Sequence, residues 1–181
     1  MKRILPAVLL LFTAAGCMFS SEKYKSPATY DLSTEYPQYE QTVNRIRMKN
    51  TSGADRRFLY RKKNNRMVFD EYNFWILDPE QLVKRAIETS FPKRSYGAVS
   101  LECCIERFEF DLAAETAVFE LTVTLSSKAG KNRTVHCKYK EKFSGKEADQ
   151  AAQAMDKCVK EALKQISSLV SGTAEKEGVR K

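Results

Sequence analysis

Five cysteines and one histidine are the side chains in this 181-residue sequence that could support nucleophilic, redox or metal chemistry. A histidine-type zinc site needs more than His136 alone, and the cysteines lack the C-x-x-C spacing of structural zinc and thioredoxin-like sites. The sequence contains no G-x-S-x-G, P-loop or G-x-G-x-x-G motif. Glu102, Glu106 and Glu109 alternate with apolar residues, which is typical of the solvent side of a strand. We therefore expect no catalytic residues, no metal and no cofactor, and a protein that binds rather than reacts.

Cys17 is set apart from the other cysteines by the residues in front of it. A positively charged start precedes an apolar run over residues 4–12 and the small residues 14–16. This is the layout of a secretory signal, and the run is shorter than the roughly 20 residues that span a bilayer. A cysteine directly after small residues resembles the bacterial lipoprotein box, in which the thiol receives a diacylglycerol group and becomes the new N-terminus. We expect residues 1–16 to be removed and Cys17 to be lipidated, with a further acyl chain such as palmitate, because stable anchoring takes more than one chain. The alternative is an uncleaved segment that buries a free cysteine.

Export restricts the partners that the basic composition suggests. Loss of Lys2 and Arg3 with the signal lowers the formal net charge from +8 to +6. Because an exported protein does not meet the genome, we expect no nucleic acid, and anionic lipid headgroups or an acidic protein become the expected partners. Plain solubility is the alternative reason for the charge. Met18 follows Cys17 where an aspartate would retain a lipoprotein in the inner membrane of enterobacteria, so we expect an outer-membrane lipoprotein that faces the periplasm.

The remaining cysteines form an even set, which in an oxidising compartment allows disulfide bonds. Cys103 and Cys104 are adjacent, and neighbouring side chains on a strand point to opposite faces, so a bond between them is geometrically poor. A bond between Cys137, on a strand, and Cys158, on the last helix, is the pairing we expect. The alternative is that these cysteines are small core residues with free thiols.

The first part of the mature chain is expected to form strands. Residues 17–29 are polar and aperiodic, so we expect a tether that ends where the fold begins at Tyr30. Strand-like segments at 57–61 and 66–72 are separated by two lysines and two asparagines. Since asparagine tolerates positive φ, this spacing predicts a hairpin.

The middle of the chain predicts one short helix and then three antiparallel strands. Asp78 supplies an N-cap acceptor and Pro79 the first helical position, which predicts a helix over 79–90. Residues 98–143 alternate as strands, and their apolar residues change parity near residues 106–107, which predicts a bulge. By the same alternation, His136 is expected to face solvent.

A long final helix is expected to cover the sheet. Apolar residues recur at three- and four-residue steps as far as Leu169, and Gly172 is expected to end the helix. Residues 172–181 are then expected to form a disordered tail. The whole pattern predicts one domain over residues 30–171. We expect an α/β (α+β) two-layer sandwich in which two helices cover one face of a mainly antiparallel or mixed sheet.

Two segments are candidate interaction surfaces. The predicted hairpin is basic, which suits contact with anionic lipid or an acidic partner; the alternative is a solvated turn whose charges prevent edge pairing. Its basic residues are Arg56, Arg57, Arg61, Lys62, Lys63 and Arg66. The second segment holds Tyr72, Phe74 and Trp75, which are expected either to be core or to fill a groove in a partner, since tryptophan is enriched at interface centres.

The order of these features resembles a known family. The strand "FLYR", the segment "FDEYNFWILDPEQLVKRAI", the hairpin "FEFDLAAETAVFELTVTL" and an alanine-rich final helix follow an acylated N-terminus. Over about residues 28–171 this arrangement is similar to the ABC-type transport auxiliary lipoprotein family, and Tyr72-Asn73-Phe74-Trp75 carries the likeness best.

The resemblance implies a function without catalysis. It implies a periplasm-facing lipoprotein that works with an ABC permease and an MCE-domain protein in lipid movement between the two membranes. The alternative is an unrelated envelope lipoprotein that binds or assembles other proteins, as a scaffold or chaperone-like factor. The sequence does not distinguish a monomer from a homo-oligomer.

Overall fold

A computed structural model of the protein describes most of the chain after the N-terminal segment. The expected signal, Cys17 and most of the expected tether lie outside the described part, so cleavage and lipidation stay predictions. Side chains are described as far as Gly172. The described residues are 25–33, 35–94, 99–127, 130, 132–144 and 147–178.

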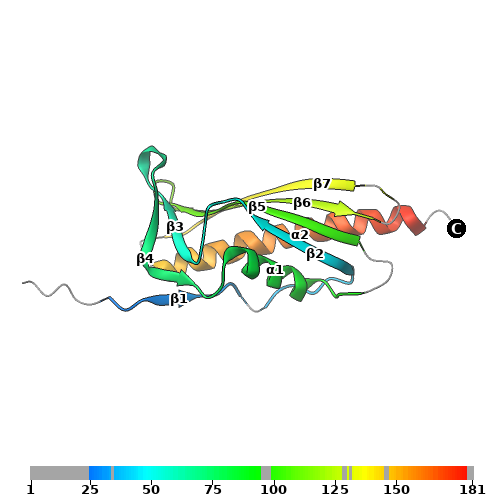
Figure 1. Cartoon of the computed structure of the whole chain (residues 1–181), viewed down its shortest axis with the longest axis horizontal. Helices are drawn as coiled ribbons and strands as arrows, with labels where there is room; N and C mark the ends of the chain where they lie inside the picture. Colours follow the sequence, from blue (N-terminus) through cyan, green and yellow to red (C-terminus); the bar gives the residue numbers. More distant parts are fainter. Residues whose placement is uncertain are drawn as a thin grey trace, which may run out of the picture.

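The described residues form a mixed sheet and two helices (Figure 1). The strands pair in the order β1-β4-β3-β5-β6-β7, and β2 pairs with β5 outside this path. The pairs β3–β4, β5–β6 and β6–β7 are antiparallel, whereas β1–β4, β2–β5 and β3–β5 are parallel. The elements are β1 (Ala28–Tyr30), β2 (Val43–Asn50), β3 (Arg57–Arg61), the 3-10 turn η1 (Lys63–Asn65), β4 (Met67–Trp75), α1 (Pro79–Ser90), β5 (Val99–Asp111), β6 (Thr116–Ser126), β7 (Asn132–Lys142) and α2 (Ala148–Gly178).

The two helices cover one face of the sheet, which confirms the predicted two-layer α+β sandwich. Helix α2 packs along β6 and β7, and α1 lies beside β2 and touches α2. The buried stripe of α2 has the predicted helical spacing and includes Ala151, Met155, Val159 and Ile166. The small side chains in this stripe let the helix axis approach the strands closely.

The predicted bulge in β5 determines which residues enter the core. Ile105 pairs with Leu121 and Arg107 pairs with Glu120, so Glu106 is an extra residue in the strand. Before it, residues 101, 103 and 105 are buried; after it, Phe108 and Phe110 are buried instead. One extra residue therefore keeps both apolar sets on the helix-covered face.

The hairpin and α1 form where the sequence predicts them. Asn64 and Asn65 have φ of 64° and 58°, the left-handed conformation that asparagine tolerates. Helix α1 spans Pro79–Ser90, and the backbone of Asp78 has the extended N-cap conformation. The Asp78 side chain makes no capping hydrogen bond, however, so proline at the first position, rather than a side-chain cap, marks this helix start.

Both predicted ends of the domain differ from the structure. Strand β1 begins at Ala28, so the tether ends before residue 29. Helix α2 does not end at Gly172 but continues to Gly178, so much of the expected disordered tail is helical. The guanidinium of Arg133 lies over Gly172, where an added Cβ would be 3.1 Å from Arg133 Nη1. Gly172 thus provides room for a neighbouring strand's side chain and is not a helix terminator.

The expected bond between Cys137 and Cys158 is wrong, because both are free thiols, as are Cys103 and Cys104. Cys137 pairs with Leu121 in the middle of β6, whereas the Cys158 thiol lies 3.8 Å from the carbonyl of Ala117. Four residues along β6 correspond to about 13 Å, well beyond the Cα spacing that a disulfide allows. The expectation failed because it could not place the helix along the strand.

We predict that the thiols differ in reactivity. Burial raises the pKa of Cys103 and Cys158 to about 12 and that of Cys137 to about 11, so all three should resist alkylation at pH 8. Cys104 is partly exposed on the open face of the sheet and should react first. Iodoacetamide labelling of the folded protein followed by peptide mass mapping measures the order. A Cys137–Cys158 cross-link in the non-reduced digest would contradict the assignment.

Candidate interaction surface at the hairpin end

The basic residues of the β3–β4 hairpin divide into a structural set and an exposed set. Arg57 is paired with Asp55, Nη2 to Oδ2 at 2.6 Å, and its guanidinium carbon lies 4.1 Å from the centroid of the Phe69 ring. Arg61 forms a two-pronged ion pair with Glu109, with N–O distances of 2.7 and 2.9 Å. Both arginines are thus paired with carboxylates of this chain, and their expected contact with an anionic partner stays a prediction.

Glu109 is the centre of a charged network on the open face of the sheet. Its side chain is only 3% exposed and also accepts from Arg107, which bridges to Glu120 on β6. Burial alone raises the pKa of Glu109, but hydrogen bonds from Arg61 and Arg107 outweigh burial and hold the pKa below its usual value. The network ties the hairpin to β5 and β6, and so holds its position.

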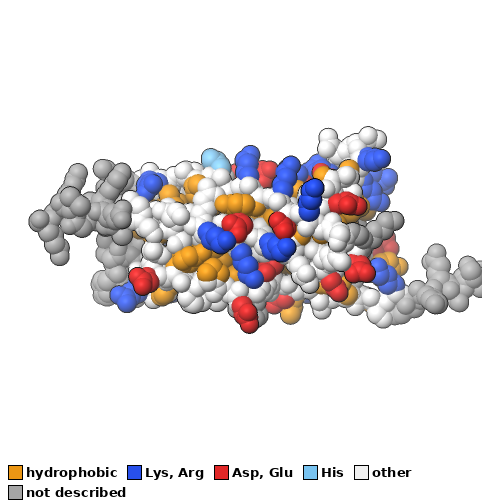
Figure 2. All heavy atoms as spheres, turned by 180° about the vertical axis from the view of Figure 1, so that it is seen from behind, with side chains coloured by type: hydrophobic (Ala, Val, Ile, Leu, Met, Phe, Trp, Pro, Cys, Tyr) orange, Lys and Arg blue, Asp and Glu red, His pale blue; other side chains and the backbone are white. Residues whose placement is uncertain are grey.

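The tip of the hairpin carries the exposed set. Lys62, Lys63 and Arg66 are all exposed, and a hydrogen bond of 2.8 Å from Lys62 N to the Arg66 carbonyl closes the loop between them. None of the three forms an ion pair with a residue of the described part of the chain. In Figure 2, which shows the molecule from behind Figure 1, basic side chains gather at the corner where the hairpin projects.

Trp75 belongs to the core, so its expected contact with a partner is wrong. It is 1% exposed, and its ring lies 4.6 Å from that of Phe58 and 5.3 Å from that of Phe108, centroid to centroid. These rings come from β3 and β5, and the sequence predicts the pairing of β3 with β4 but not the contact with β5. The expectation that the aromatic segment is mostly core is confirmed for Trp75.

Tyr72 and Phe74 are held on the outside by a wide bulge in β4. Arg57 pairs with Phe74 while Leu59 pairs with Phe69, so β4 has three more residues than β3 in this stretch. The Asp70 carboxylate accepts the backbone N–H groups of Tyr72 and Asn73 at 2.7 and 3.1 Å, and the Asn73 amide at 2.7 Å. Bulges re-aim side chains, and this one leaves Tyr72 39% exposed.

The large apolar side chains that are exposed in the described structure all lie at this end. They are Met67, Tyr72, Ile76 and Leu112, with 38 to 46% of their surface exposed. Met67 pairs with Arg61 on one side, and the Leu112 N–H donates to the Arg61 carbonyl on the other. Sequence reasoning missed Met67, Ile76 and Leu112; their one signal is that each lies where a strand begins or ends.

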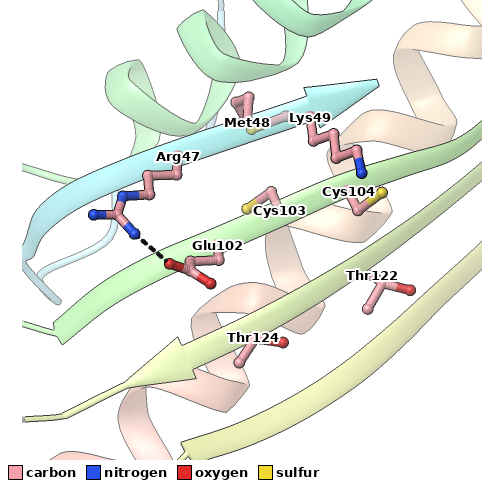
Figure 3. Close-up of a pocket in the computed structure, with 8 residues that line it drawn as sticks. All are labelled: Arg47, Met48, Lys49, Glu102, Cys103, Cys104, Thr122 and Thr124. Carbon is pink, nitrogen blue, oxygen red and sulfur yellow. Dashed lines mark hydrogen bonds and ion pairs between the residues drawn. The ribbon is translucent and has the colours of Figure 1, made fainter. Parts of the chain in front are cut away.

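The open face of the sheet has a separate hollow of about 350 Å³ between β2, β5 and β6 (Figure 3). Arg47 on β2 is paired with Glu102 on β5 at 2.8 Å, and Lys49 and Cys104 project beside them. Side chains of both signs line this hollow, and an open, shallow surface with paired charges does not select one ligand. It is therefore a weaker candidate site than the hairpin end.

His136 is exposed beside this hollow, as predicted. Its Nδ1 lies 2.8 Å from the Thr122 hydroxyl, which donates to Glu106. In a hydrolase triad the imidazole stands between hydroxyl and carboxylate, whereas here the hydroxyl stands between the other two groups. This order does not activate Thr122 as a nucleophile. Within the described residues, no group of three or more His, Cys, Asp or Glu side chains is arranged to hold a metal ion.

Comparison with known proteins defines the fold of this chain and no more. No family model and no curated protein matches the sequence. A solved structure of an uncharacterised protein aligns over 80% of this chain and 99% of its own, with a TM-score of 0.68 and 11% identity. A structure from Xanthomonas campestris, a protein of the family DUF330, covers 84% of this chain and 98% of its own, with a TM-score of 0.59 and 14% identity. The two-layer α+β arrangement is thus one that solved proteins share.

Neither α1 nor the described part of α2 combines the length and the apolar character that crossing a membrane requires.

We predict that Glu109→Gln destabilises the protein by about 2 to 3 kcal/mol at pH 7. This is below the roughly 3 to 5 kcal/mol of a fully buried pair, because Arg61 and Arg107 keep about a quarter of their side chains in water. Since the folded pKa of Glu109 is lowered, its contribution is complete above the unfolded value near 4.3 and is lost as the pH falls through the folded value. The difference in free energy of unfolding between the variant and the wild type should therefore be smaller in acid.

Urea unfolding at pH 7 and at pH 3 to 4 measures both effects. Glu102→Gln is the matched control, because Glu102 is on the same strand and its ion pair with Arg47 is more than half exposed. That variant should change stability by less than about 1 kcal/mol. An equal loss of stability in Glu109→Gln and Glu102→Gln would show that the Glu109 network does not hold the hairpin.

Proposed function

We propose that this protein is a lipid-anchored, periplasm-facing auxiliary component of an MCE-type ABC transport system. In this proposal it assists lipid movement between the inner and outer membranes by binding a protein partner, an MCE-domain protein or the ABC permease, and it is not an enzyme. The family resemblance that supports this is to the ABC-type transport auxiliary lipoproteins, which include the paraquat-inducible lipoprotein C. The likeness to solved structures supports the fold on which the proposal rests.

The observation that carries the proposal is the outward row of Tyr72, Phe74 and Ile76 on β4 and just beyond it. Tyr72 and Ile76 are among the exposed large apolar residues, and Phe74 is half-buried between them. Tyrosine and large apolar side chains are enriched at the centres of protein interfaces. The Asp70 bulge holds the row in place before a partner arrives, which lowers the entropic cost of binding.

The described part of the chain begins beside this row. Lys25, the first described residue, has its ammonium 5.4 Å from the centroid of the Tyr72 ring, and the chain then enters β1 alongside β4. A lipidated Cys17 would therefore place the row near a membrane. The absence of aspartate at Met18 supports the outer membrane as that location.

We predict that the tagged, lipidated full chain captures an MCE-domain protein or an ABC permease from detergent-solubilised envelopes. Replacing Tyr72 and Ile76 together by serine should reduce capture at least tenfold, since central interface residues each contribute more than about 1 kcal/mol. Quantitative mass spectrometry of the captured proteins measures the change.

The matched control replaces Met67 and Leu112 by serine, because these residues have the same exposure but lie at the hairpin tip. This variant should capture the partner as well as the wild type does. Recovery of neither an MCE-domain protein nor a permease would contradict the proposal and favour the rival class, an envelope binding or assembly lipoprotein. Capture that is unchanged by the Tyr72 and Ile76 substitutions would exclude the β4 row as the contact.

A further inference from the structure

We propose that the hairpin tip is a second membrane contact, which rests on the anionic headgroups of the bilayer that holds the lipid anchor. The tip consists of Lys62, Lys63 and Arg66 with Met67 and Leu112. The inference rests on the proposed lipid anchor at Cys17 but not on the identity of the protein partner. It assigns a fixed orientation to the domain, with its hairpin end against the membrane.

The composition of the tip suits a membrane surface. Three exposed basic side chains lie within five residues, and the apolar side chains of Met67 and Leu112, 38% and 40% exposed, flank the strand that leads to them. Basic residues near an anionic surface contribute about 1 kcal/mol each, and adjacent apolar side chains add contact with the headgroup region. Arg57 and Arg61 are not included in the tip, because Asp55 and Glu109 pair with them.

The tip is also held rigidly with respect to the sheet. Arg61, directly before Lys62, is fixed by the buried Glu109, and its Nη1 lies 3.5 Å from the Asn65 side-chain oxygen. The backbone bond from Lys62 to Arg66 closes the loop. A tip that is already ordered loses little conformational entropy on docking.

The described chain begins at the same end of the molecule as the hairpin. Lys25 lies eight positions after Cys17, and a fully extended chain of that length spans at most about 28 Å. Strand β4, which runs from the tip to the side of β1, is itself about 27 Å long. The tip is therefore within the range that a lipid anchor on Cys17 permits, and Figure 1 shows β1 and the hairpin at one end of the molecule.

The charge at the opposite end provides a matched control. Lys93 and Arg94 are adjacent, exposed and basic, and they lie next to Val43, at the start of β2. That region pairs with the first residues of β5, whereas the hairpin pairs with the last ones. Replacing Lys62 and Lys63 by glutamate changes the net charge by the same amount as replacing Lys93 and Arg94 by glutamate. The two double variants therefore differ only in where the charges lie.

The experiment uses the lipidated full chain with an environment-sensitive dye on Leu112→Cys, in a Cys104→Ser background that removes the other accessible thiol. The protein is bound to vesicles of phosphatidylcholine alone or with about a third phosphatidylglycerol. On the anionic vesicles we expect a blue-shifted dye that iodide does not quench, and on neutral vesicles an exposed dye. Salt at 1 M, with a screening length near 3 Å, should return the dye to water.

Lys62→Glu with Lys63→Glu should weaken docking by at least about fivefold per lysine, the equivalent of roughly 1 kcal/mol each, while Lys93→Glu with Arg94→Glu should leave it unchanged. A dye that stays exposed on anionic vesicles would overturn the proposal, as would equal effects of the two charge reversals. Protection that appears only after an acidic protein partner is added would assign the tip to that partner instead.

The outcomes separate this inference from the proposed function. A protein that does not remain on vesicles at all lacks the lipid anchor, which contradicts the proposed anchoring. A protein that remains bound with an exposed dye keeps the anchor but does not dock its tip. Capture of the MCE-domain or permease partner is measured with Tyr72 and Ile76 changed, and neither residue belongs to the tip.

Discussion

The bulge at Glu106 in β5 is the constraint on which the rest of the structure depends. If this sequence formed a regular strand without a bulge, burial of Leu101 and Ile105 would turn Phe108 and Phe110 to the open face. With it, one strand of 13 residues contributes to a single core over its whole length. Its first half pairs with β2 and its last residues with β3, so the bulged strand also joins the hairpin to the main sheet.

Two carboxylates, those of Glu109 and Asp70, fix the positions of the side chains at the hairpin end. Glu109, just after the bulge, fixes Arg61 and with it the direction of the hairpin. Asp70 organises the backbone of the β4 bulge and so keeps Tyr72 outside while Trp75 enters the core. Both groups have a lowered pKa, because the hydrogen bonds that they accept outweigh the effect of burial. The paired charges around Glu109 and Asp70 thus support the fold, and the exposed apolar residues and the basic tip are left for binding.

The candidate binding surfaces are gathered at one end of the sheet. One end of the sheet combines the exposed apolar residues, an unpaired basic tip and the beginning of the described chain, whereas the open face holds paired charges and a hydroxyl between His136 and Glu106. In our proposals the tip of the hairpin meets lipid headgroups and the β4 row meets a protein. The two contacts are adjacent on one strand, so a partner bound to the row would be held beside the membrane.

Local signals in the sequence determined most of the fold: the asparagine pair at the hairpin, proline at the start of α1, the parity change at the β5 bulge, and the periodic stripe of α2. Each depends on residues a few positions apart, so it can be read without knowing the tertiary structure. Most predictions that failed concerned partners distant in sequence, and the side-chain cap that Asp78 does not form is the local exception. Only the tertiary structure decided that Trp75 is buried by Phe58 and Phe108, that Glu109 neutralises Arg61, that Arg133 lies over Gly172, and that Cys158 stands away from Cys137. Burial and pairing are set by the neighbours that folding brings together, and the order of residues along one segment does not specify them.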